Sequence, residues 1–428
     1  MASFLPKSFV YGRSFRKAKS VHSKFEAATC KENFVAKFTE INIIKSLEVA
    51  TRTHFYRARL VGNILAKQQL IDKDDVVSAG DEIVRSKLMA DLITTGGTSG
   101  KPLAFHINKD RKGVEWYWMT AGWAKVGFDY KKSWRAVLRN QSLNGKMYEV
   151  NPLLKEVYFD NYRLEDDYLE FVTEEIKRRS IVFVHAYPSA AYTLALHWKK
   201  NGNAPGCVKT FLCGSENVFP QQKNLIQNEL GKRMFTWFGH SEKLILAHEG
   251  ETCENYHSNP FYGCTEIINE SGEAVTVKGE FGELVGTGYI NTKTPFIRYR
   301  TGDFAEYVGQ SCPDCGHVGL TFKNVKGRWA GEKVYLLDGK SVSTTSLNLH
   351  DAIYTQVDGL QYYQEKMGQL EIRVIANSLW NNNSGDLLVN YLKSKIPEGL
   401  EFTLKIVAEL EFTKNRKYQL LIQRVKSV

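Results

Sequence analysis

Helix-like and strand-like segments alternate in the middle of this chain, and the alternation constrains its fold more than any other feature of the sequence. Tyr168, Phe171, Val172 and Ile176 recur at helical spacing and fall on one face of a helix. Residues 180–184 then form an apolar run that is typical of a buried strand. The pattern continues as helix, strand, helix and strand at residues 190–200, 208–212, 221–230 and 234–238. Repeated strand–helix units predict a layered α/β body.

The two ends of the chain follow other patterns. Residues 1–90 read mainly as helix, and strand signals begin at Asp91. Beyond residue 327, one helix is expected at 386–395, and strands are expected at 333–337, 362–365, 370–375 and 401–407. The predicted fold class is therefore α/β, with a large layered α/β N-terminal domain at 1–327 and a small α+β C-terminal domain at 328–428.

The composition narrows the class of partner. Hydrophobic residues make up 43% of the 428 residues and charged residues 24%, as in ordinary globular proteins. No segment approaches about 18 uninterrupted apolar residues, so we expect no membrane span. The net charge of +10 suggests a nucleic-acid partner, but basic and acidic residues are interspersed and no nucleic-acid-binding motif appears. We expect anionic small substrates and no nucleic acid.

The cysteines bear on the compartment. Their number is seven, which is odd, and their spacing is not that of a secreted disulfide scaffold. We therefore expect a reducing, cytoplasmic compartment. The sequence does not fix the oligomeric state, and a homodimer remains open.

Residues 94–102, which read Thr-Thr-Gly-Gly-Thr-Ser-Gly-Lys-Pro, lie between two strand-like segments. Backbone N–H groups and short hydroxyl side chains in such a loop can wrap phosphate oxygens. Lys101 adds a mobile cation for the outer phosphates. A P-loop would need a helix to begin after the lysine, and Pro102 argues against that. The alternative to a phosphate loop is a flexible polar hairpin.

This loop resembles the phosphate-binding signature of the adenylate-forming (ANL) superfamily, with Gly96 standing where serine is usual. Two further segments, at residues 235–242 and 297–303, resemble the Y-G-x-T-E and Y-R-T-G-D boxes of that superfamily. The finer resemblance is to the phenylacetate–CoA ligases and the capsule polysaccharide biosynthesis branch. It covers nearly the whole chain and is thin between Val114 and Ile176. It implies an ANL-type fold and an ATP-dependent, AMP-forming carboxylate ligase.

The resemblance also implies roles for individual residues. Glu242 would bind Mg²⁺, since Mg²⁺ prefers one or two carboxylates together with phosphate oxygens. Thr98 would act in catalysis, and with Lys101 it would hold the leaving pyrophosphate. Asp303 would accept the ribose hydroxyls, and Phe238 would stack on adenine. The remaining cofactor-binding candidates are Thr95, Gly97, Ser99, Gly100, Gly214, Ser215, Glu216, Gly239, His240 and Arg328.

The C-terminal domain carries the third catalytic candidate. Residues 412–417 resemble the P-x-T-x-x-G-K ending of the family, which makes Lys417 the lysine that reaches the α-phosphate and the carboxylate. Arg416 stands where glycine is usual, and Lys414 is the alternative. In relatives this small domain is mobile and rotates between the two half-reactions.

A cysteine pair predicts a metal site within residues 248–320. Cys312 and Cys315 form a C-x-x-C turn, and two thiolates on a turn are half of a tetrahedral zinc site. Cys253 and His257 are candidates for the other half, and the capsule-type relatives resemble this arrangement. Cys264 and His248 are rival ligands. Four protein ligands leave no open position, so we expect a structural role.

The substrate is less constrained. His185 or His240 is expected near the carboxylate, although either one could be a structural histidine. The cofactors implied are ATP, Mg²⁺, Zn²⁺ and, for thioester formation, CoA. The acceptor could instead be an amine or a hydroxyl, as in polysaccharide biosynthesis. The alternative function is a non-catalytic protein that keeps the fold and binds a nucleotide or a partner.

Overall fold

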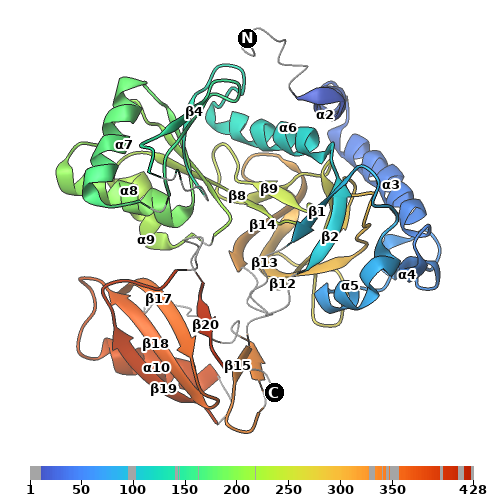
Figure 1. Ribbon diagram of the computed structural model, residues 1–428. Helices are drawn as coiled ribbons and strands as arrows, with labels where there is room; N and C mark the ends of the chain where they lie inside the picture. Colours follow the sequence, from blue (N-terminus) through green and yellow to red (C-terminus); the bar gives the residue numbers. More distant parts are fainter. Residues whose placement is uncertain are drawn as a thin grey trace.

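The fold class predicted from the sequence is confirmed, and Figure 1 shows the large part of the chain and the smaller, orange and red C-terminal part. A computed structural model describes residues 11–94, 103–139, 143, 145–161, 163–216, 218–326, 333–339, 341–343, 347, 356–395, 399–412 and 419–425. Its helices are α2 (Gly12–Glu26), α3 (Lys31–Ala50), α4 (His54–Arg57), η2 (Leu65–Lys67), α5 (Lys73–Ala79), η3 (Gly80–Ile83), α6 (Arg111–Trp123), η4 (Ala124–Val126), α7 (Asp166–Arg178), α8 (Pro188–Asn201), α9 (Pro220–Lys223), η5 (Asn224–Glu229) and α10 (Ser384–Lys395).

The strands belong to one large sheet, two hairpins and one small sheet. They are β1 (Ala90–Thr94), β2 (Ala104–Asn108), β3 (Arg135–Leu138), β4 (Glu149–Asn151), β5 (Glu156–Tyr158), β6 (Phe183–Ala186), β7 (Thr210–Gly214), β8 (Arg233–Gly239), β9 (Leu246–His248), β10 (Tyr256–Ser258), β11 (Gly263–Ile268), β12 (Phe281–Gly288), β13 (Tyr299–Ser311), β14 (Val318–Lys326), β15 (Lys333–Tyr335), β16 (Ser341–Ser343), β17 (Val357–Gln364), β18 (Gln369–Ala376), β19 (Glu401–Ile406) and β20 (Leu421–Gln423).

The large sheet has 12 strands in the order β11-β12-β13-β14-β10-β9-β8-β7-β6-β3-β5-β4. Strands β5, β3, β6, β7 and β8 run parallel to their neighbours in this group. From β8 to β11 the pairing is antiparallel. The parallel group corresponds to the alternating strand–helix region of the sequence.

Successive residues of the parallel strands are buried on opposite faces of the sheet. Val184 and Met234 share a core with α7 and α8. Phe183 and Phe235, each one position away, belong to the core that includes α6 and α2. Burial on both faces explains why these strands read as continuous apolar runs.

Several predicted boundaries shift in the structure, and two of these shifts have a local cause. The strand expected at 180–184 begins at Phe183, because Ser180 has φ of 50° and ends the turn after α7. The helix expected at 221–230 divides into the short helix α9 and the π-helical turn η5. The mainly helical pattern expected at the N-terminal end of the chain holds for residues 12–83, which contain the helices α2 to η3. Among the described residues, no helix is long and apolar enough to cross a membrane.

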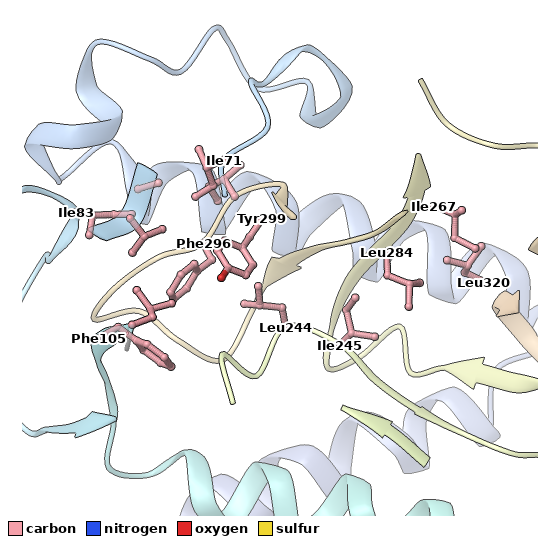
Figure 2. Packing of buried hydrophobic residues seen from close by; sticks show 14 of the residues in the cluster. Ile71, Ile83, Phe105, Leu244, Ile245, Ile267, Leu284, Phe296, Tyr299 and Leu320 are labelled. Atoms are coloured by element: carbon pink, nitrogen blue, oxygen red, sulfur yellow. The ribbon is translucent and has the colours of Figure 1, made fainter. Parts of the chain in front are cut away.

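A buried cluster anchors the hairpin β1–β2. Its strands pair antiparallel as far as Thr94 and Ala104, at the base of the predicted phosphate loop. Phe105 on β2 contacts Phe296 edge-on, with 5.3 Å between the ring centres. The ring centres of Phe296 and Tyr299 lie 5.1 Å apart. Figure 2 shows these rings with the aliphatic residues around them. Residues 95–102 of the loop itself lie outside the described residues.

The C-terminal part has a core of its own. Its four-stranded sheet has the order β19-β18-β17-β20. Leu388 and Leu392 of α10 pack on this sheet in a cluster whose buried members all lie between Val334 and Leu421. This is the small α+β domain of the predicted fold class. The predicted boundary at 327/328 falls outside the described residues, so the exact division of the chain stays a proposal.

Candidate functional site

Glu242 lies in the turn after β8, three residues beyond the end of that strand. Its side chain is fully buried, and Oε2 is 2.9 Å from Nδ1 of His240. The backbone N–H of Ile245 donates to Nε2 of His240 at 3.3 Å. Because Nε2 is an acceptor, Nδ1 carries the proton of the neutral ring and donates it to Glu242.

Tyr299 holds the second oxygen of the same carboxylate. Its hydroxyl donates to Oε1 of Glu242 at 3.4 Å. Tyr299 begins β13 and belongs to the core beneath the hairpin β1–β2 (Figure 2). The carboxylate is therefore fixed in direction, close to the strands that flank the predicted phosphate loop. A fixed carboxylate is a ligand type that suits Mg²⁺.

Asp303 lies within strand β13. The strand is irregular here, because its register with β12 shifts between Glu283 and Val285 and Gly302 has φ of 73°. Thr301 donates its hydroxyl to the carbonyl of Leu284 at 2.7 Å and accepts from the Asp303 N–H at 3.0 Å. A bulge of this kind redirects a side chain from a strand.

The residues expected along the adenine occupy the ends of β7 and β8. Phe238 is half-buried on β8 and precedes Gly239, the last residue of that strand. Gly214 ends β7, where an added Cβ would lie 2.5 Å from the indole of Trp237. The close approach that requires glycine here is therefore made by a side chain of the protein. Sequence reasoning assigned that approach to the nucleotide.

Ser215 and Glu216 have partners within the protein. Ser215 has φ of 70°, and its hydroxyl accepts from Arg139 at 2.7 Å. Glu216 accepts from the backbone N–H of Ser189 at 3.1 Å, in the first turn of α8. A carboxylate at a helix N-terminus is favoured by the helix dipole.

Several predicted site residues lie outside the described residues, and their roles stay predictions. They are Thr95, Gly97, Thr98, Ser99, Gly100, Lys101, Arg328, Lys414 and Lys417.

A cationic cluster at the carboxyl ends of β3, β6 and β7 was missed by sequence reasoning. Arg139 follows β3 directly, and its Nη1 is 2.6 Å from Nε2 of His185 on β6. Arginine only donates, so Nε2 accepts and the proton of the neutral ring sits on Nδ1. Burial, helped by Arg139 and Arg135, holds the pKa of His185 well below its usual range. No sequence motif marks Arg139, because it lies between Val114 and Ile176, where the resemblance to the superfamily is thin.

Four side chains from two distant segments form a metal-binding arrangement. The ligand atoms of Cys253, His257, Cys312 and Cys315 all lie within 4.8 Å of one another. The Cys253 sulfur is 3.8 Å from that of Cys312 and 3.9 Å from that of Cys315. Nε2 of His257 is 3.5 Å from the Cys253 sulfur and 3.4 Å from the Cys315 sulfur.

These separations fit a tetrahedral zinc ion. With Zn–S distances of about 2.3 Å and a Zn–N distance of about 2.0 Å, sulfur ligands lie about 3.8 Å apart and sulfur and nitrogen about 3.5 Å apart. The rival ligands His248 and Cys264 are not members of the group among the described residues. All seven cysteines are free thiols, so no disulfide competes for these sulfurs.

The sheet brings the two halves of this site together. Cys312 follows β13 and opens a tight turn that Gly316, with φ of 70°, closes by donating to the Cys312 carbonyl at 2.9 Å. His257 lies on β10, which pairs with β14 beyond that turn. Asn255 donates to the Cys312 sulfur at 3.6 Å and stabilises its thiolate.

The surroundings suit a metal with three thiolate ligands. Burial lowers the pKa of His257 to about 3, and the nearby Lys125 contributes, so the imidazole is neutral as a ligand must be. His317 stacks on His257 at 4.5 Å. Zn²⁺ with three thiolates has a net charge of −1, and Nζ of Lys125 lies 3.2 Å from the far nitrogen of His257. Lys125 was not predicted. The sulfurs of Cys315, Cys253 and Cys312 attract its cation, which would offset that charge.

Comparisons with known proteins identify the architecture. No family model matches the chain. Protein CapK of Staphylococcus aureus is 21% identical over 381 residues, covering 83% of this chain and 79% of that protein. Crystal structures of 2-hydroxyisobutyryl-CoA ligase are similar in fold. In the postadenylation state with R3-HIB-AMP, the identity is 13% and the TM-score 0.61, over 92% of this chain and 89% of that one. In the thioesterification state with 2-HIB-AMP and CoA, the identity is 15% and the TM-score 0.54, over 90% and 89%. The chain therefore has the fold of the adenylate-forming enzymes that its three sequence motifs predicted.

Proposed function

We propose that this protein is an ATP-dependent, AMP-forming carboxylate ligase. The observation that carries the proposal is the buried carboxylate of Glu242, which His240 and Tyr299 orient beneath the hairpin that flanks the Gly-rich loop. Metal-bound ATP needs a carboxylate and a phosphate-binding loop side by side. The similar ligase that binds 2-HIB-AMP and CoA adds support from the fold.

The first half-reaction forms an acyl-adenylate. A carboxylate oxygen attacks the α-phosphorus of ATP, and the bond from that phosphorus to the departing pyrophosphate breaks. In the proposed arrangement, Lys101 and Thr98 hold the pyrophosphate, and Lys417 stabilises the charge that builds where the bond forms. Mg²⁺ bound by Glu242 would neutralise charge on the phosphate oxygens.

The nucleoside is held by other groups. Asp303 is proposed to accept the ribose hydroxyls, with Arg328 beside them. Phe238 offers its ring to adenine. Ser215, Glu216 and the neighbouring Gly214 are proposed to border the base, although each already has a contact within the protein.

In the second half-reaction an acceptor attacks the acyl carbon, and AMP leaves. We propose CoA or an amine or hydroxyl group as the acceptor, because all three types of ligase share the motifs above. The small C-terminal domain would rotate between the two steps. The similarity to Protein CapK makes polysaccharide biosynthesis a candidate setting.

Zinc is proposed to hold the fold together rather than to react. Four protein ligands complete its tetrahedron and leave no position for substrate. A site of three free thiols also favours a reducing compartment such as the cytoplasm. A homodimer remains open.

The test is ATP–pyrophosphate exchange over a panel of carboxylic acids, compared between the natural protein and Glu242→Ala. We expect exchange with at least one acid, and its loss in the variant. Glu270→Ala, in an exposed turn, serves as the matched control and should retain activity. Tight ATP binding without exchange for any acid would favour the non-catalytic alternative. Full exchange by Glu242→Ala would refute the role of that carboxylate.

A further inference from the structure

The parallel strands present a cation on one face of the sheet, at their carboxyl ends. Side chains alternate along a strand, so Arg139 and His185 project on the same face as Phe183 and Phe235, which pack toward α6. In the sheet, Leu138 lies beside Ala186, and Ala186 lies beside Cys213. The residues next to these three positions therefore meet at the carboxyl edge of the strands. Ligands of parallel α/β sheets bind at this edge.

Aromatic rings surround this cation. The guanidinium carbon of Arg139 lies 4.9 Å from the ring centre of Tyr187 and 5.5 Å from that of Trp237. The ring centre of Trp123, at the end of α6, lies 5.0 Å from that of His185 and 5.6 Å from that of Trp237. The rings form an apolar wall of the kind that encloses an organic substrate.

The hydrogen-bond partners of Arg139 are neutral. They are Nε2 of His185 at 2.6 Å, the hydroxyl of Ser215 at 2.7 Å and the hydroxyl of Tyr187. Within the described part of the chain, the carboxylate of Glu216 attracts the guanidinium electrostatically without forming a direct ion pair with it. A guanidinium has five N–H donors in a fork that matches a carboxylate. Arg139 is partly exposed, so an anionic ligand can reach this fork.

His185 has a second donor, on the side of its ring that faces away from Arg139. Its Nδ1 is inaccessible to solvent and has no hydrogen-bond partner among the described residues. The contact with Arg139 fixes the proton of the neutral ring on this Nδ1. A buried donor left unpaired costs free energy, so the cluster is incomplete without an acceptor.

We propose that the acid activated by this protein carries a second anionic group, and that Arg139 binds it. The substrate class is thus a carboxylic acid with a further carboxylate or comparable anion, enclosed by the aromatic rings. This inference rests on the proposed ligase function and goes beyond it by naming the substrate class. Arg139 acts as a specificity-determining residue and takes no part in the chemical step.

Matched pairs of acids test the proposal. Butyrate is compared with succinate, and benzoate with isophthalate, as substrates for ATP–pyrophosphate exchange. We expect the diacid of a pair to be used with at least about tenfold higher kcat/KM, because hydrogen bonds between charged groups are strong. Arg139→Leu should remove that preference and leave the KM for ATP unchanged. Arg139→Lys, which keeps the charge, should retain part of the preference.

The control is Arg178→Leu, which removes an exposed arginine on α7 and should change neither ratio nor rate. Equal or better use of the monoacids by the natural protein would overturn the inference while leaving the ligase proposal intact. The same holds if Arg139→Leu keeps the diacid preference. A raised KM for ATP with an unchanged acid preference would assign Arg139 to the nucleotide instead. No exchange with any acid by the folded protein would overturn the ligase proposal and this inference with it.

Discussion

Replacing Gly250 by alanine should disturb the zinc site without removing a ligand. A Cβ at this position would lie 2.4 Å from the sulfur of Cys253 and 2.8 Å from Cε1 of His257. A relaxed contact between such atoms is about 3.5–4.0 Å, so the sulfur must move by roughly 1 Å. Gly250 is not among the residues with positive φ, so its backbone accepts alanine and only the contact matters.

The size of the effect follows from how little the zinc–ligand distances can change. Ligand distances at a zinc site hold to within about 0.2 Å, and a structural zinc ion binds with about 10–16 kcal/mol. Loss of one ligand in four therefore corresponds to about 3–4 kcal/mol, or roughly a 10²–10³-fold weaker affinity. Because zinc binding contributes to folding, the melting temperature of the zinc-loaded protein should fall as well.

Competition with a chromogenic chelator measures the zinc affinity of Gly250→Ala, Cys253→Ser and the natural protein. Gly206→Ala is the matched control, because a Cβ there meets no atom within 4 Å. We expect zinc near one equivalent in the natural and control proteins. Unchanged zinc affinity in Gly250→Ala would show that the sulfur of Cys253 is not held where the structure has it. Natural protein without zinc would refute the site altogether.

Three further outcomes are expected. Tyr299→Phe removes one hydrogen bond to Glu242, worth about 0.5–1.5 kcal/mol, and should raise the Mg²⁺ concentration needed for exchange severalfold; no change would remove Tyr299 from the site. Lys417→Ala should slow adenylation by roughly 10²–10³-fold while ATP affinity persists; a silent variant beside an inactive Lys414→Ala would shift the assignment to Lys414. Burial and two nearby arginines hold the pKa of His185 well below 6.5, so the folded chain resists its protonation. The contribution of the neutral His185 to the free energy of unfolding is therefore fully present above pH 6.5. It is lost as the pH falls below that value, by up to about 1.4 kcal/mol per pH unit. In urea denaturation, the free energy of unfolding of His185→Asn should fall less steeply with decreasing pH.

The sequence by itself determined the architecture, because local patterns repeat the geometry of the elements. The apolar runs that predicted buried strands became the parallel strands β6, β7 and β8, covered by helices on both faces. The strand signals on either side of the Gly-rich segment became the paired strands β1 and β2. The motif order that suggested an adenylate-forming enzyme agrees with the fold of the similar CoA ligase.

Only the tertiary structure decided which distant side chains meet. Cys253 and Cys312 lie 59 residues apart, and the pairing of β10 with β14 brings their sulfurs together. Among the described residues, the rivals His248 and Cys264 are not members of the group. Arg139 carries no motif, and its contact with His185 exists because β3 and β6 are neighbours in the sheet. Local sequence encodes periodicity and turn chemistry, whereas a site depends on the register between strands, which arises when the whole sheet assembles.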